Sequence, residues 1–298
     1  REKSFFECNV VNKDWQDKDF FISMKHCYFE IAPNKAVVRL YAHELVEAYQ
    51  NNLLSGKLKE IAAGLNEEDR IIQIGSMIVD SKEPIEIYDE LCSCEVPIKL
   101  EAMEVHNITP DLLKNKPKFI DSKFYRRLNE LNSSENFLIA HNLPFDLGML
   151  EKEGFENRFT LIDTLRCARH LLEDSPYHRL QYLRYSLELY KNELEEANKH
   201  NITIKAHDAI GDVLVMKLLL SKLVTLAKEQ YPQTLPMQTL TDLTKTPVFI
   251  KKFKFGKYKG RNIEDICNED IEYINWFKGN MQLDEDMKYT LDKIVGNI

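Results

Sequence analysis

The sequence predicts an α/β fold, and three observations carry this prediction. Two β-rich runs, DRIIQIGSMIVD and PIEIYDELCS, are separated by the turn signal DSKEP. The wholly apolar run FLIA at 137–140 is followed directly by a helix-like segment, as is typical of a strand buried in an α/β sheet. In TLIDTLRCARHLL, at 160–172, a short strand again leads into a helix. We therefore expect strands and helices to alternate through the central part of the chain.

The chain divides into four parts by its patterns. A small β-β-α unit is expected first, because residues 20–41 read as a hairpin turning at Pro33, Asn34 and Lys35, and residues 43–63 read as a helix. The sequence assigns no function to this unit, for which we consider binding of a protein partner. The predicted parts are an N-terminal unit at 1–63, an α/β domain at 64–228, a linker at 229–248 and a C-terminal module at 249–298.

Three segments in the second half of the chain shape this division. Residues 206–228 read as a long amphipathic helix with an apolar inner face. Residues 229–248 show little periodicity and contain three prolines, so they are expected to be a linker. The acidic run NELEEANKH, at 192–200, is expected to be a solvated helix face.

Composition excludes several classes of protein. The chain has 298 residues, of which 44% are hydrophobic and 30% charged, enough to bury a core. It has no run of eighteen apolar residues and no long apolar core of a secretory signal near its start, so we expect no membrane segment and a cytoplasmic location. The six cysteines form no C-x-x-C pair, which argues against a zinc site.

Charge is distributed unevenly. The formal net charge of −8 argues against non-specific coating of nucleic acid by the whole surface. Residues 251–261, however, contain six Lys or Arg and no acid, interleaved with three aromatic rings. Such a stretch suits a phosphate backbone with stacked bases, and the alternative is a hairpin with core aromatics and solvated lysines. The nucleic-acid candidates are Lys254, Lys257 and Lys259.

The stretch AHNLPFDLGML, at 140–150, places polar side chains where ligands bind in α/β sheets, beyond the carboxyl end of a strand. Asp146 falls in the first turn of the following helix, where a carboxylate faces the positive end of the helix and can hold a hard cation. The structural alternative is that Asp146 caps the helix while His141 and Asn142 satisfy loop carbonyls.

A second polar pattern, HDAIGD, opens the long helix at 206–228. His207 and Asp212 lie five positions apart, and Asp208 competes for the role of Asp212. An acid in the first turns of an otherwise apolar helix is costly unless it binds something. This element therefore predicts a second part of the same site.

Together these two elements resemble the DnaQ-like DEDDh 3′–5′ exonucleases, whose fingerprint is D-x-E-T-T-G, then H-N-x-x-F-D, then H-x-A-x-x-D. HNLPFD and HDAIGD match the second and third motifs. Over residues 64–228 the resemblance implies a ribonuclease-H-like mixed sheet flanked by helices. It also implies Asp146 and Asp212 as metal ligands and His207 as the general base. The tail FKFGKYKGRNIEDICNEDIEYINWF further resembles the small C-terminal module of exodeoxyribonuclease X-like proteins.

The function implied by this resemblance is hydrolysis of 3′-terminal nucleotides from DNA or RNA, with DNA preferred. Two Mg²⁺ or Mn²⁺ ions about 3.5–4 Å apart would stabilise the attacking and leaving oxygens, and a histidine would take a proton from water. The terminal nucleotide would lie near His141, Asn142 and Phe145.

The first motif departs from the family pattern. Lys59 and Ile61 stand where the D-x-E carboxylates are expected, and the segment around them reads as a helix. Loss of these ligands should empty at least one ion position. Three explanations stay open: Glu7 or Glu30 replaces them, the chain binds nucleic acid without cutting it, or the segment before residue 64 is foreign to this fold. A protein-interaction scaffold without either activity is the remaining alternative.

Overall fold

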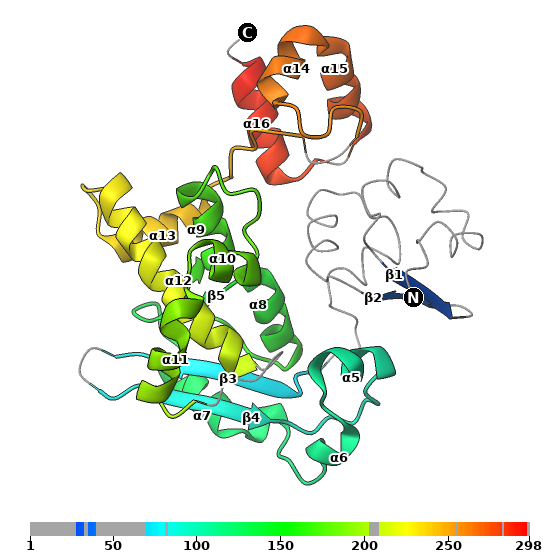
Figure 1. The fold of residues 1–298 in the computed structure, drawn as a ribbon. Coiled ribbons are helices and arrows are strands. Elements are labelled where there is room, and N and C mark those ends of the chain that lie inside the picture. The colour runs from blue at the N-terminus through cyan, green and yellow to red at the C-terminus, as the bar shows by residue number, and fades with distance from the viewer. Residues whose placement is uncertain are drawn as a thin grey trace. The chain divides into compact units, whose positions relative to one another are not determined.

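The computed structural model describes most of the chain, which divides into two units (Figure 1). One unit comprises Glu67–Thr246, and the other comprises Arg1–Asn66 with Pro247–Ile298. The described residues are 28–32, 35–39, 70–80, 83–202, 209–253, 256–281 and 283–296.

Two short strands lie near the N-terminus. β1 (Tyr28–Ala32) pairs antiparallel with β2 (Lys35–Arg39), inside the segment predicted as a hairpin, and Glu30 lies opposite Val37. The helix predicted at 43–63 lies outside the described residues, as do Glu7, Lys59 and Ile61.

The described residues of the central unit form four strands at the predicted places. β3 (Gln73–Ile78) pairs antiparallel with β4 (Glu86–Leu91). β5 (Phe137–Ala140) pairs parallel with β6 (Thr160–Asp163), so that Ala140 lies opposite Asp163. The parallel pairing brings the carboxyl ends of both strands to one edge. This mixture of strands and helices confirms the α/β prediction for the unit.

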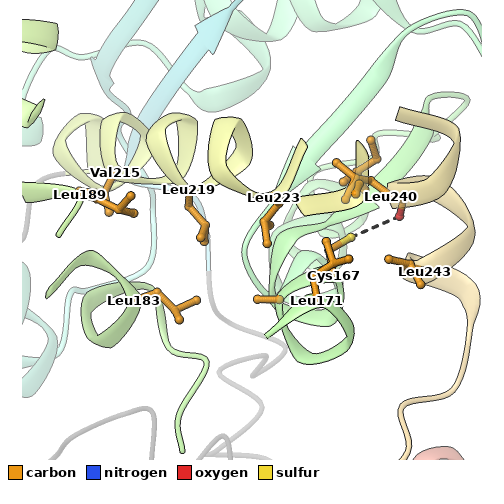
Figure 2. Packing of buried hydrophobic residues seen from close by; sticks show 12 residues of the cluster. Cys167, Leu171, Leu183, Leu189, Val215, Leu219, Leu223, Leu240 and Leu243 are labelled. Carbon is orange, nitrogen blue, oxygen red and sulfur yellow. Dashed lines mark hydrogen bonds between the residues drawn. The ribbon is translucent and has the colours of Figure 1, made fainter. Parts of the chain in front are cut away.

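Four helices pack against α12 (Ala209–Gln230), which buries Val215, Leu219 and Leu223. They are α9 (Thr164–Leu171), α10 (Leu180–Ser186), α11 (Tyr190–Lys199) and α13 (Pro236–Lys245). Figure 2 shows the core to which α9, α10, α12 and α13 contribute. The unit also contains α5 (Leu100–His106), α6 (Pro110–Leu113), η3 (Phe119–Asp121), α7 (Lys123–Leu131) and α8 (Leu143–Lys152).

Helix α13 corrects the prediction of a linker at 229–248. Pro236 occupies the first turn of the helix, where its missing N–H costs no hydrogen bond. Leu240 and Leu243 are buried in the core of the unit, and the Cys167 thiol donates a hydrogen bond to the Leu240 carbonyl oxygen at 3.3 Å (Figure 2). The prolines that suggested a linker therefore include one that begins a core helix.

A glycine sets how closely the start of α12 approaches β3. A Cβ atom on Gly75 would lie 2.4 Å from the carbonyl carbon of Ala209 and 2.6 Å from the backbone nitrogen of Ile210. Real Cβ atoms essentially never approach backbone so closely, so a side chain at this position would push α12 away from the strand. Gly75 therefore positions the helix turn that carries Asp212.

The C-terminal module, within the second unit, consists of α14 (Ile263–Glu269), α15 (Ile271–Asn280) and α16 (Glu285–Val295). Its core includes Phe253, which is 1% exposed, together with Ile266 and Phe277. Nowhere in the described part of the chain is there a helix with the length and apolar character that a membrane span requires.

Candidate active site

Asp146 lies in the first turn of α8, as predicted. The residue before this helix, Asn142, adopts a left-handed backbone conformation with φ 73° and ψ 51°, which asparagine tolerates better than most residues. The Asp146 carboxyl reaches the surface. Even so, the protein around it limits solvation of the charged form and, with a smaller contribution from Asp163, raises its pKa to about 6.

Asp163 lies beside the candidate site, and the sequence predicted no role for it. It ends β6, is 3% exposed and caps α9. Its Oδ1 accepts hydrogen bonds from the backbone N–H groups of Asn142 at 3.1 Å and Leu165 at 2.9 Å. Burial raises the pKa of this carboxyl. An aspartate between a strand and a helix is a recognisable N-cap signal, so Asp163 was detectable from the sequence.

The ring of His141 is held on both sides by the protein. Nε2 lies 2.9 Å from the carbonyl oxygen of His178, and Nδ1 lies 2.9 Å from Oγ1 of Thr164. A carbonyl oxygen only accepts, so in the neutral ring Nε2 carries the proton. Burial, with the nearby Arg169 charge, lowers the pKa of His141 to about 4, so the ring is neutral at pH 7.

This arrangement is the structural alternative considered for His141, since its ring satisfies a loop carbonyl. Both ring nitrogens thus contact protein groups, and the Thr164 hydroxyl also donates to the Ala140 carbonyl oxygen at 3.1 Å. In the structure the His141 ring ties the loop before α8 to residue 178, and its contact with a substrate stays a prediction. Phe145, by contrast, is 41% exposed on α8 and can be reached by a ligand.

Asp212 lies in the first turn of α12 with its side chain exposed. Gln181 in α10 donates a hydrogen bond from Nε2 to Oδ1 of Asp212 at 2.8 Å. The predicted base His207 and the competing Asp208 lie outside the described residues.

The carboxylates of Asp146 and Asp212 have the right chemistry for a hard cation. Mg²⁺ is usually bound by one or two carboxylates, with waters and substrate phosphates completing its coordination. The described residues contain no group of three or more histidine, cysteine or acidic side chains that could hold a metal ion. Each of these carboxylates is thus a suitable ligand for Mg²⁺ or Mn²⁺, and a complete metal site needs ligands from outside the described part.

The basic stretch of the C-terminal module is partly engaged within the module. The Lys257 ammonium lies 3.0 Å from Oδ2 of Asp270 and 4.6 Å from the centre of the Tyr258 ring. The Tyr258 hydroxyl donates to the same carboxylate at 2.5 Å, and these contacts lower the pKa of Asp270 to about 2. Lys259 is exposed, and its ammonium pairs with no residue that the structure describes. Lys254 lies outside the described residues.

The aromatic residues of this stretch also differ from one another. Phe253 belongs to the core of the module, as the structural alternative for this stretch expected. Tyr258 is half-buried, and Trp276 on α15 is 52% exposed. Of the predicted nucleic-acid contacts that the structure describes, Lys259 is therefore the one with its charge directed to solvent.

Comparison with known proteins matches two parts of the chain. The family model described as Exonuclease matches residues 60–220, and the model described as Exodeoxyribonuclease X-like C-terminal matches residues 253–282. Exodeoxyribonuclease 10 of Escherichia coli (strain K12) is 25% identical over 232 residues, covering 76% of this chain and 93% of that protein.

A polymerase and a solved structure are also similar to this chain. The PolC-type DNA polymerase III of Bacillus subtilis (strain 168) is 28% identical over 170 residues, which are 54% of this chain and 11% of that protein. Among solved structures, Exonuclease X in complex with 5′ overhanging duplex DNA matches with a TM-score of 0.41 and 20% identity, over 60% of this chain and 93% of that one.

Proposed function

Since the chain belongs to the exonuclease family, whose model matches more than half of its residues, we propose that it removes nucleotides from the 3′ ends of DNA by metal-assisted hydrolysis. Family membership supports a nuclease that acts on DNA. The 3′–5′ direction, the metal ions and the residues below are the parts that we propose.

The observation that carries the proposal is the Asp146 carboxylate. It lies at the carboxyl edge of the β5–β6 pair, at the positive end of α8, and it reaches the surface. The protein around it disfavours the charged form and raises the pKa of this carboxyl to about 6. A bound cation would relieve this cost, which is why we assign Asp146 to metal binding.

Asp146 and Asp212 would hold Mg²⁺ or Mn²⁺, which when bound would lower the pKa of a water molecule and neutralise charge on the phosphate. His207 would take the proton from the attacking water. The exposed ring of Phe145 would pack against the terminal nucleotide beside Asn142, whose backbone N–H is already fixed by Asp163.

The number of ions depends on the first motif. With Lys59 and Ile61 in the places of its carboxylates, the chain retains two of the four expected ligands. Two ions would require Glu7, Glu30 or another acid to take their place. The alternative function is a relative that binds DNA ends without cutting them, and the same assay separates the two.

The C-terminal module would add affinity for the DNA backbone. The support for this role is the match of residues 253–282 to a module of exodeoxyribonuclease X-like proteins, and the exposed charge of Lys259. Contacts between lysines and phosphates do not depend on sequence but weaken as salt rises. Lys257 would contribute less, because Asp270 already pairs with it.

The test is degradation of a single-stranded DNA oligonucleotide labelled at its 5′ end, in Mg²⁺ or Mn²⁺, beside an Asp212→Ala variant. The proposal predicts a ladder of labelled products that shortens from the 3′ end and is lost in the variant. Digestion from the 5′ end would instead release the label as a mononucleotide and contradict the proposed direction.

A binding measurement on the same oligonucleotide in EDTA completes the test. Binding by the wild-type protein without a ladder in metal would favour the non-cutting alternative. A Lys259→Ala variant should bind more weakly with a smaller salt dependence. Absence of both cutting and binding would leave the scaffold as the remaining alternative.

A further inference from the structure

A short segment, residues 178–181, is attached to both elements of the proposed site. At one end, the His178 carbonyl oxygen lies 2.9 Å from Nε2 of His141, in the loop that leads into α8. At the other end, Gln181 donates a hydrogen bond to Oδ1 of Asp212 at 2.8 Å. The loop that carries His141 and the helix that carries Asp212 are therefore linked through four consecutive residues.

Gln181 is itself held by an ion pair between a half-buried arginine and a buried glutamate. Its Oε1 accepts a hydrogen bond from Nη1 of Arg184 at 3.1 Å. Arg184 in turn makes a bidentate pair with Glu193, with Nε–Oε1 and Nη2–Oε2 distances of 2.5 Å each. The Glu193 side chain is 5% exposed, which corrects the expectation that the acidic run at 192–200 is a fully solvated face.

The ion pair determines which way the Gln181 amide points. An arginine only donates hydrogen bonds, so the atom that faces Arg184 is the amide oxygen. The amide NH₂ group must then face Asp212, whose carboxylate oxygens accept. The hydrogen bond to Asp212 is consequently set by the fold and does not depend on a free choice of amide orientation.

We propose that Gln181 is a positioning residue for the exonuclease reaction, which fixes the orientation of the Asp212 carboxylate for metal binding. The inference rests on the proposed function, since it needs Asp212 to be a metal ligand. Groups that hydrogen-bond to metal ligands typically change metal affinity or activity by about 10–100-fold when removed. Gln181 is exposed, so the lower end of this range is expected.

The test compares Gln181→Ala with a matched control, Gln238→Ala. Gln238 in α13 also donates to an aspartate on its own surface, Asp242, at 2.8 Å, and it has no place in the proposed site. Binding of Mn²⁺ to the full chain without DNA is measured by isothermal titration calorimetry. We expect about tenfold weaker binding in Gln181→Ala, unchanged binding in Gln238→Ala, and similar unfolding temperatures for both.

Kinetics give a second measurement that a merely structural role would not change. In Gln181→Ala, the Mn²⁺ concentration for half-maximal cleavage should rise by the same factor as the dissociation constant. The KM for DNA should stay at the wild-type value, and turnover should recover at saturating Mn²⁺.

An Asp212→Ala protein separates failure of this inference from failure of the proposed function. If Asp212→Ala weakens Mn²⁺ binding but Gln181→Ala binds like the wild type, the positioning role of Gln181 is wrong and the proposed function stands. If the wild type binds no Mn²⁺, or Asp212→Ala binds as tightly as the wild type, both proposals are wrong.

Discussion

The end of strand β6 and the first turn of helix α8 each carry an aspartate, and the fold treats these two carboxylates differently. Asp163 is 3% exposed, and its Oδ1 accepts hydrogen bonds from the N–H groups of Asn142 and Leu165. Asp146 reaches the surface, and among the described residues its own backbone N–H contributes the hydrogen bond that favours its charged form.

The difference separates a structural carboxylate from one that can bind a ligand. Burial raises the pKa of both groups, so the direction of the shift does not distinguish them. The number of hydrogen bonds distinguishes the two carboxylates. N–H donors from two segments of the chain meet at Asp163 and connect the segment after β5 to α9. The surroundings of Asp146 disfavour its charged form, and no such set of N–H donors from the described residues compensates for this. This is expected for a carboxylate whose partner is a cation.

The largest stability effect should come from the structural aspartate. Asp163→Ala leaves the buried N–H of Leu165 and the partly buried N–H of Asn142 without acceptors, and loss of an acceptor for a buried group costs about 1–3 kcal/mol. We expect the free energy of unfolding to fall by about 3 kcal/mol, measured by urea denaturation.

Asp163→Asn is the matched control, because its amide oxygen can still accept both hydrogen bonds. We expect this variant to lie within about 1 kcal/mol of the wild type. Equal losses in Asp163→Ala and Asp163→Asn would mean that the charge, and not the hydrogen bonds, stabilises this edge.

A smaller, pH-dependent effect should come from Asp146. Its folded-state pKa of about 6 lies above the ordinary value of 3.8, so between these values the folded chain holds a proton that the unfolded chain has released. The favourable contribution of Asp146 protonation to the free energy of unfolding is thus complete below pH 3.8 and is lost as pH rises through 6. The side chain of Asp146→Asn does not ionise, so this variant should become more stable than the wild type as pH rises from 3.8 through 6.

We expect this gain to be about 1 kcal/mol at pH 8 and absent at pH 4, since solvent access reduces the effect. Unfolding temperatures of both proteins in EDTA, from pH 4 to 8, measure it. A constant difference across this range would contradict the raised pKa of Asp146.

Several parts of the fold could be predicted from local pattern alone. The apolar run at 137–140 and the apolar face of the helix at 206–228 depend on short-range periodicity, and the structure has a strand and a helix there. Helix α13 could not be predicted in this way. Its buried side chains are interrupted by polar ones, and it is stabilised by contacts with β6 and α9, such as the hydrogen bond from the Asp163 N–H to Thr244 Oγ1.

The same distinction applies to the site. The positions of Asp146 and Asp212 in first helical turns follow from sequence spacing. The partners of His141, Gln181 and Glu193 do not, because each lies on an element brought close only by folding. The sequence therefore indicated the residues that we propose as metal ligands, and the structure shows which residues contact them.

The central claim is that the Asp146 carboxylate binds a metal ion for cleavage, whereas the Asp163 carboxylate stabilises the fold. The most direct test is the cleavage rate of a 5′-labelled oligonucleotide by Asp146→Asn and Asp163→Asn, both confirmed as folded. We predict that Asp146→Asn cuts at least about 10³-fold more slowly, as expected for loss of a metal ligand, while Asp163→Asn stays within about tenfold of the wild type. Wild-type cleavage by Asp146→Asn, or an inactive but folded Asp163→Asn, would contradict the claim.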